Sequence, residues 1–237
     1  MNRLFRILAL QLIFASLVGC QSIPDEQASS MQNMLSIGNY QGVIAHYRQR
    51  LEMDPDDHEA MDAIAHAYYQ IGDVESASFY TRYLSEHGYA NQQVAQLMGQ
   101  VAADIGNDEE ALSHYFDSIE LGNKGAQVHN LIGISYSRLE HFESATTAFN
   151  QARLQGYDEA TVKNNLAVVY LAKSDYRSVV SILAPLIEQQ PQNKTVNANL
   201  ALALSKLGRY QDARSLLEAD YSDEDIHHIL YQIGRKE

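Results

Sequence analysis

A spacing of 34 residues organises this chain from Asp25 to Asp220. Reading at that interval gives a ladder of turn-forming residues: Gly38, Gly72, Gly106, Glu140, Ser174 and Gly208. Five residues later the same interval gives a ladder of small or β-branched residues: Val43, Ala77, Ala111, Ala145, Val179 and Ala213. No insertion or deletion disturbs the register. A constant period of this size indicates stacked structural units and not a single globular core.

The unit that spans residues 58–91 shows how each repeat is built. Its first apolar residues recur at three- and four-residue spacing, which places them on one helix face: Met61, Ile64, Ala65 and Tyr68. Gly72 then ends the helix, because glycine adopts the left-handed C-terminal conformation without a Cβ penalty. A second apolar stripe follows, formed by Val74, Ala77, Phe79, Tyr80 and Leu84. The sequence therefore predicts one helical hairpin per unit.

Two further ladders have a packing reason. Seven residues before the turn position most side chains are short: Met31, Ala65, Gly99, Gly133, Ala167 and Ala201. Antiparallel helices approach closely only where side chains are short, so this ladder predicts tight hairpins. A ladder of mostly large residues should fill the gap to the next unit: Tyr47, Thr81, Tyr115, Phe149, Leu183 and Leu217.

These ladders resemble the tetratricopeptide repeat. The unit 126–159 carries the family pattern as Gly133, Tyr136, Phe142, Ala145, Phe149 and Ala152, and closing prolines occur as Pro55 and Pro191. Glu140 and Ser174 at the turn, and Thr81 at the aromatic position, depart from the pattern. The resemblance implies an all-α fold, a right-handed α-solenoid of about six tetratricopeptide repeats over residues 31–221.

A capping helix and tail are expected over residues 222–237. Ser222 with Asp225 three residues later is a helix start, and acidic residues there favour the helix N-terminus. The helix predicted at 225–234 should turn four apolar residues inward: Ile226, Ile229, Leu230 and Ile233. A solenoid needs such a cap because its last repeat has an unpartnered apolar face.

The first 30 residues are expected to lie outside the solenoid. Residues 1–19 have the basic start and short apolar run of a signal peptide. They end in Leu17-Val18-Gly19, followed by Cys20, a tetrad that resembles the lipobox of bacterial lipoproteins. The resemblance implies that Cys20 becomes the acylated N-terminus and that residues 20–30 tether the solenoid to the membrane. An ordinary secretory signal with an incidental cysteine is the alternative.

The net charge and the composition limit the kinds of partner that this chain can bind. The formal net charge is −13, and cleavage after Gly19 would remove two arginines and no acid. An acidic surface argues against nucleic acid, whose phosphates need a cationic footprint. Gln21 after the cysteine, where retained lipoproteins often carry aspartate, implies sorting to the periplasmic face of the outer membrane. Cys20 is the one cysteine in the sequence, so no internal disulfide is expected.

Catalytic and metal motifs are weak. His227 and His228 are adjacent and lack a third ligand at helical spacing. The stretch 122–125 lacks the Gly-Lys-Ser/Thr ending of a phosphate loop. No nucleophile elbow occurs, so neither enzymatic activity nor a cofactor or metal is predicted.

The repeat resemblance also implies a peptide-binding groove lined by the first helix of each unit. Positions 2, 5, 9 and 12 of the units supply the candidates His66, Tyr69, Gln93, Gln96, Gln100, Gln127, Asn130, Asn164, Val168 and Leu171. Amides donate and accept hydrogen bonds, so the middle of the groove could hold a peptide backbone. Its apolar C-terminal part could hold anchoring side chains. The alternative is that these are solvated polar positions.

The C-terminal third resembles the TadD family of Flp/Tad pilus assembly lipoproteins. Paired Asn-Leu-Ala stretches at 165–167 and 199–201 and the acidic end at 221–225 carry the resemblance. It implies a non-catalytic, pilotin-like factor that binds secretin subunits or other Tad/Flp components. A type IV pilus pilotin and a periplasmic adaptor for a protease or peptidoglycan hydrolase remain alternatives.

Overall fold

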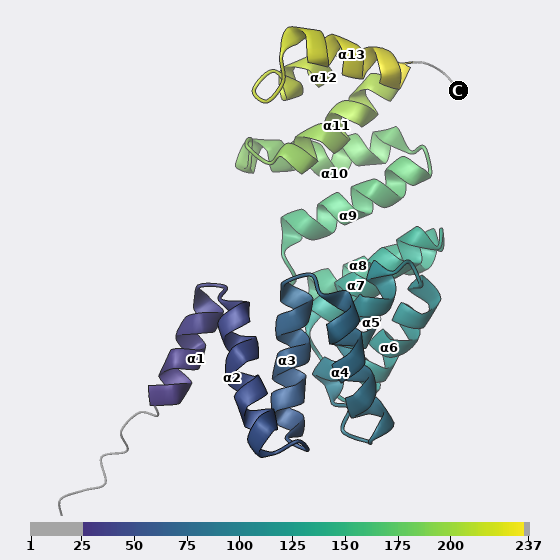
Figure 1. Ribbon diagram of the computed structural model, residues 1–237. Helices are drawn as coiled ribbons and strands as arrows, with labels where there is room; N and C mark the ends of the chain where they lie inside the picture. Colours follow the sequence, from purple (N-terminus) through teal and green to yellow (C-terminus); the bar gives the residue numbers. More distant parts are fainter. Residues whose placement is uncertain (1–25, 235–237) are drawn as a thin grey trace, which may run out of the picture.

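The computed structural model describes residues 26–234 (Figure 1), and all regular structure in that range is helical. The expected signal peptide 1–19, the acylation site Cys20 and the first part of the tether lie outside the described residues. Between residues 26 and 234 no helix has both the length and the apolar character needed to cross a bilayer.

Six helical hairpins follow one another along the chain. Their first helices are α1 (Glu26–Ser36), α3 (His58–Gln70), α5 (Gln92–Asp104), α7 (Ala126–Arg138), α9 (Glu159–Ala172) and α11 (Lys194–Lys206). Their second helices are α2 (Tyr40–Met53), α4 (Val74–Glu86), α6 (Asp108–Glu120), α8 (Phe142–Leu154), α10 (Tyr176–Gln189) and α12 (Tyr210–Leu217). The predicted all-α solenoid of six repeats is confirmed. Helix α1 begins at Glu26, within the segment expected as a tether.

All six turn positions of the 34-residue ladder adopt positive φ angles. Glu140 and Ser174, with φ angles of 60° and 57°, take the same left-handed conformation as the glycines of the other turns. A second glycine ladder, which sequence reading did not identify, ends the second helices at Gly88, Gly122 and Gly156. The register alone therefore fixes where each hairpin turns.

Side-chain caps begin most of the helices. The Asp73 carboxylate accepts a hydrogen bond from the Ser76 N–H at 3.0 Å, and Asn193 caps α11 through Val196 at 3.2 Å. Such caps satisfy backbone donors that have no partner within the helix. Because they recur at successive units, each capped helix starts at a defined residue after a short turn.

The ladder of short residues packs beneath the ladder of large ones. A Cβ atom placed on Gly99 would lie 2.4 Å from the Tyr115 ring, and one placed on Gly133 would lie 2.6 Å from Phe149. Both rings are almost fully buried. They also belong to apolar clusters that extend into the next unit, with Val128 and Val162 respectively. Each large side chain thus closes its own hairpin as well as the gap to its neighbour.

The first helices line the inner side of the array (Figure 1). Helices α3, α5, α7, α9 and α11 contact each other in succession, whereas no described second helix contacts the second helix of the next unit. First helices that are closer together than second helices make a stack curve. The described part of α1 does not contact α3, so the first unit departs from this arrangement.

Helix α13 (Asp223–Gly234) closes the C-terminal end of the stack. The Ser222 hydroxyl accepts a hydrogen bond from the Asp225 N–H at 3.2 Å and donates one to its carboxylate at 2.6 Å. Ile226 is fully buried against the last hairpin, and Ile229 and Leu230 pack beside it. The helix starts two residues earlier than the sequence indicated, because Ser222 itself is the N-cap.

Candidate functional site

The inner face is the candidate binding surface. Four successive first helices carry the residues that the sequence singled out: His66 and Tyr69 on α3, Gln93, Gln96 and Gln100 on α5, Gln127 and Asn130 on α7, and Asn164, Val168 and Leu171 on α9. Gln93, Gln127 and Val168 are exposed, Asn130 is buried, and the others are half-buried. Their role in binding stays a prediction.

One ladder of this face joins the units to each other. Its four members, Asp62, Gln96, Asn130 and Asn164, each accept a hydrogen bond from an asparagine side chain that lies on the first helix of the next hairpin or in the loop just before it. The donors are Asn91 at 2.8 Å, Asn123 at 2.9 Å, Asn165 at 2.8 Å and Asn199 at 2.9 Å, respectively. We call these four contacts the asparagine staples.

The staples change the interpretation of three predicted groove residues. The side-chain oxygens of Gln96, Asn130 and Asn164 each already accept a hydrogen bond from the protein, so each has one acceptor position fewer for a bound peptide. Asn130 has only 4% of its surface exposed and is therefore the least accessible of the three to a ligand. A buried polar side chain without a partner is costly, so these pairs stabilise the unit boundaries. The sequence placed the acceptors correctly on the inner helices but did not identify their donors.

Two polar side chains of α3 are also engaged. Burial, and next the Asp104 carboxylate, raise the pKa of Tyr69 to about 12, and the Tyr69 hydroxyl also contacts Gln100. His66 Nε2 lies 3.3 Å from Asp62 Oδ1. Burial raises the pKa of Asp62, but contacts with His66 and Asn91 outweigh it and hold that pKa below its usual value.

The C-terminal part of the inner face is more apolar. Val168 is 44% exposed, and Leu171 packs partly against the large C-terminal core. Leu202 of α11 is half-buried. An apolar side chain from a partner would find contact here, whereas Gln93 and Gln127 would contact polar groups nearer the middle.

The chemistry on this face is that of contact and hydrogen bonding. Over residues 26–234 no three His, Cys, Asp or Glu side chains are grouped to hold a metal ion. His227 and His228 are exposed on α13 with acidic neighbours and do not form such a group. A curved face of this kind suits a bound polypeptide.

Comparisons with known proteins identify the repeat. Two sequence models described as tetratricopeptide repeat match residues 130–178 and 170–224. A CTR9 homolog of Arabidopsis thaliana is 30% identical over 200 residues, covering 77% of this chain. The BBSome complex member bbs-4 of Caenorhabditis elegans is 22% identical over 178 residues, or 75% of this chain. The matches span only 18% and 38% of those two proteins.

Solved structures extend the likeness over most of the chain. PilF of Pseudomonas aeruginosa superposes with a TM-score of 0.68 at 16% identity, covering 86% of this chain and 95% of PilF. A tetratricopeptide repeat protein of Parabacteroides merdae gives 0.68 at 14% identity, covering 88% and 84%. YrrB, a repeat protein with an unusual peptide-binding site, gives 0.58 at 18% identity, covering 70% and 86%. The sequence models therefore identify tetratricopeptide repeats over residues 130–224, and the solved structures show the same repeat fold over most of the chain, a fold suited to protein–protein interaction.

Proposed function

We propose that this protein is a lipid-anchored pilotin at the periplasmic face of the outer membrane. In this proposal it binds and localises secretin subunits of a Flp/Tad pilus. The observation that carries the proposal is the likeness to PilF, a pilus-related repeat protein, which extends over almost the whole of both chains. The lipobox-like sequence at Leu17–Cys20 supports the lipid anchor, and the ending at 221–225 supports the TadD resemblance.

The inner face supplies a mechanism for capture. A segment of a secretin subunit would lie along α5, α7 and α9, with polar contacts to Gln93 and Gln127 and an apolar anchor near Val168. The staples fix the positions of these helices relative to one another, so the inner face is preorganised. The protein therefore loses little conformational entropy when it binds a partner. Acyl chains on Cys20 would then carry the captured subunit to the membrane.

A type IV pilus pilotin is the second candidate, because PilF is a pilus-related repeat protein and the likeness to it does not select one pilus system. Part of the TadD resemblance has a structural explanation, because Asn165 and Asn199 in the two Asn-Leu-Ala stretches are staple donors. Such residues follow from repeat packing and do not select a pilus system. The neighbouring genes would distinguish the two pilus systems. Genes for Tad ATPases and Flp pilin would indicate a Flp/Tad pilus, whereas twitching-motility genes would indicate a type IV pilus.

A crosslinking pull-down from membranes tests the function. The wild-type protein and Cys20→Ser serve as baits, and outer-membrane secretin multimers are measured in both strains. We expect secretin as the main partner of the wild type and fewer multimers in the Cys20→Ser strain. Capture of hydrolases or proteases without secretin would replace the pilotin by the adaptor alternative. Normal secretin multimers after deletion of the gene would equally overturn it.

A matched pair of variants locates the binding surface. Val168→Glu places a charge on the inner face, and Leu154→Glu makes a similar change at a residue that is 72% exposed at the end of α8. We expect Val168→Glu to lower secretin capture at least tenfold and Leu154→Glu to leave it unchanged. Equal capture by both variants would show that the inner face is not the binding surface.

A further inference from the structure

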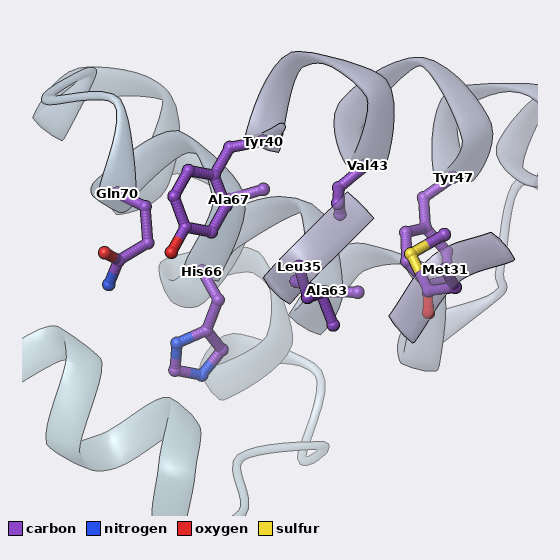
Figure 2. Close-up of a pocket in the computed structure, with 9 residues that line it drawn as sticks. All are labelled: Met31, Leu35, Tyr40, Val43, Tyr47, Ala63, His66, Ala67 and Gln70. Atoms are coloured by element: carbon purple, nitrogen blue, oxygen red, sulfur yellow. The ribbon is translucent and has the colours of Figure 1, made fainter. Parts of the chain in front are cut away.

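An apolar pocket lined by α1, α2 and α3 opens at the N-terminal end of the inner face. It has a volume of about 340 Å³. Its apolar walls are Met31 and Leu35 of α1, Val43 and Tyr47 of α2, and Ala63 and Ala67 of α3 (Figure 2). For scale, a cavity of roughly 150 Å³ holds a benzene molecule. The pocket therefore has room for a substantial apolar group.

The pocket exists because the first boundary is not closed. Helices α3, α5, α7, α9 and α11 contact each other in turn, but α1 and α3 do not. Among the described side chains the staples begin at Asp62, and none of them joins α1 to α3. Leu35 is left 49% exposed on the pocket wall, although it faces an otherwise apolar space. An apolar occupant would complete this boundary.

We propose that the pocket shelters one acyl chain of the lipid on Cys20. The inference rests on the acylation of Cys20 in the proposed function. Cys20 lies six positions before Glu26, where α1 begins. An extended chain of that length reaches about 20 Å. Met31 lies about 8 Å along α1 from Glu26, so the pocket is within reach of the attachment point.

The arrangement of the walls sets the direction of entry. Met31 and Tyr47 lie at the end of the pocket nearer to the start of α1 (Figure 2). Tyr40, His66 and Gln70 lie at the other end and give it a polar edge. An acyl chain attached through Cys20 enters past Met31 and contacts Leu35, Val43 and the two alanines. The polar edge separates this pocket from the rest of the inner face.

The sheltered chain has a consequence for membrane binding. A single acyl chain gives only marginal membrane attachment, whereas two or more hold a protein stably. Moving one chain between the pocket and the bilayer therefore changes how firmly the protein is anchored. It also covers apolar surface that would otherwise face water while the protein is away from the membrane.

Photocrosslinking from the acyl chain tests the proposal. Cells are fed a diazirine-bearing fatty acid, and the acylated protein is purified, exchanged out of detergent and illuminated as a monomer. Mass spectrometry first reads the acyl mass on the peptide that begins at Cys20, then the crosslinked peptides. We expect most intramolecular crosslinks in residues 31–47 and 63–70. Crosslinks elsewhere, or no acyl mass on Cys20, would overturn the proposal.

A matched pair of variants makes the test specific. Ala63→Leu fills the pocket, and Ala184→Leu makes the same change at an exposed position of α10. We expect the first to reduce pocket crosslinks at least fivefold and the second to leave them unchanged. Equal crosslinking by both variants contradicts a chain bound in the pocket. Secretin capture is scored separately, so failure of the pilotin function and failure of the pocket proposal give different results.

Discussion

The boundaries between units differ at the two ends of the array. From α3 to α11 each boundary combines contact between first helices with an asparagine staple. Between α1 and α3 both features are absent from the described residues, and a pocket of about 340 Å³ takes their place. The inner side of the array is therefore closed at the later boundaries and open at the first one.

The comparison shows what the staples contribute. Apolar ladders at constant register bring successive hairpins together, but they do not by themselves close the inner side of a boundary. Where a polar pair joins two successive hairpins, the inner side of the boundary is closed and one acceptor position on that face is occupied by the protein itself. Where no pair is present, apolar side chains such as Leu35 stay exposed.

The largest expected effect comes from adding the same side chain to each region. Gly133→Leu should lower the free energy of unfolding by about 3 kcal/mol or more, because even its Cβ atom would lie 2.6 Å from the buried Phe149 ring. Ala63→Leu, which grows into the open pocket, should change it by less than about 1 kcal/mol. Chemical denaturation followed by circular dichroism measures both. Similar losses for the two variants would mean that the first boundary is as tightly packed as the others.

Removing an asparagine staple should lower the free energy of unfolding less than the steric clash of Gly133→Leu does. Asn165→Ala should lower the free energy of unfolding by about 1–3 kcal/mol, because it leaves the buried Asn130 carboxamide without its partner. Asn199→Ala should cost less, because its acceptor Asn164 is only half-buried. A double-mutant cycle on Asn130 and Asn165 isolates the pair. A coupling energy near zero would show that the hydrogen bond adds nothing to the boundary.

Much of the fold could be predicted from the sequence because the constant 34-residue register shows which positions of distant units have the same structural role. The register identified all six turns, including those at Glu140 and Ser174 where no glycine marks them. It also predicted the close approach of Gly99 and Gly133 to their neighbours. At Gly99 and Gly133 the missing side chain directly indicates that an aromatic ring lies close to the backbone.

The candidate site was less predictable for a physical reason. Position within the unit placed Gln96, Asn130 and Asn164 on the inner helices, but it could not show that they were already paired. Their donors lie 27 to 35 residues later: Asn165 and Asn199 share one register position on helices, whereas Asn123 lies in a loop outside that register. The open pocket was missed as well, because it depends on the placement of α1 relative to α3.

Acid should weaken the first closed boundary selectively. Its staple uses a carboxylate, Asp62, where the three others use amides that do not titrate. Because the folded-state pKa of Asp62 lies below its ordinary value of about 3.9, its stabilisation is present above that pH and is lost as pH falls through the lower pKa. Asp62→Asn should therefore flatten the decline of stability below about pH 4, whereas Glu52→Gln at an exposed position of α2 should not. If stability falls in parallel with decreasing pH in the wild type, Asp62→Asn and Glu52→Gln, Asp62 does not cause the loss of stability in acid.

The smallest expected effect lies in the turns, which both regions share. Glu140 and Ser174 adopt φ angles of 60° and 57°, which cost a residue with a Cβ atom about 1 kcal/mol relative to glycine. Glu140→Gly and Ser174→Gly should therefore each stabilise the protein by up to about 1 kcal/mol, after the entropy cost of glycine in the unfolded chain is included. Gly106→Ala, at a φ angle of 84°, should destabilise it by a similar amount. Thermal unfolding of the three variants measures the differences. If all three changes lower stability equally, side-chain contacts and not backbone conformation set the cost of these turns, and the register reports packing alone.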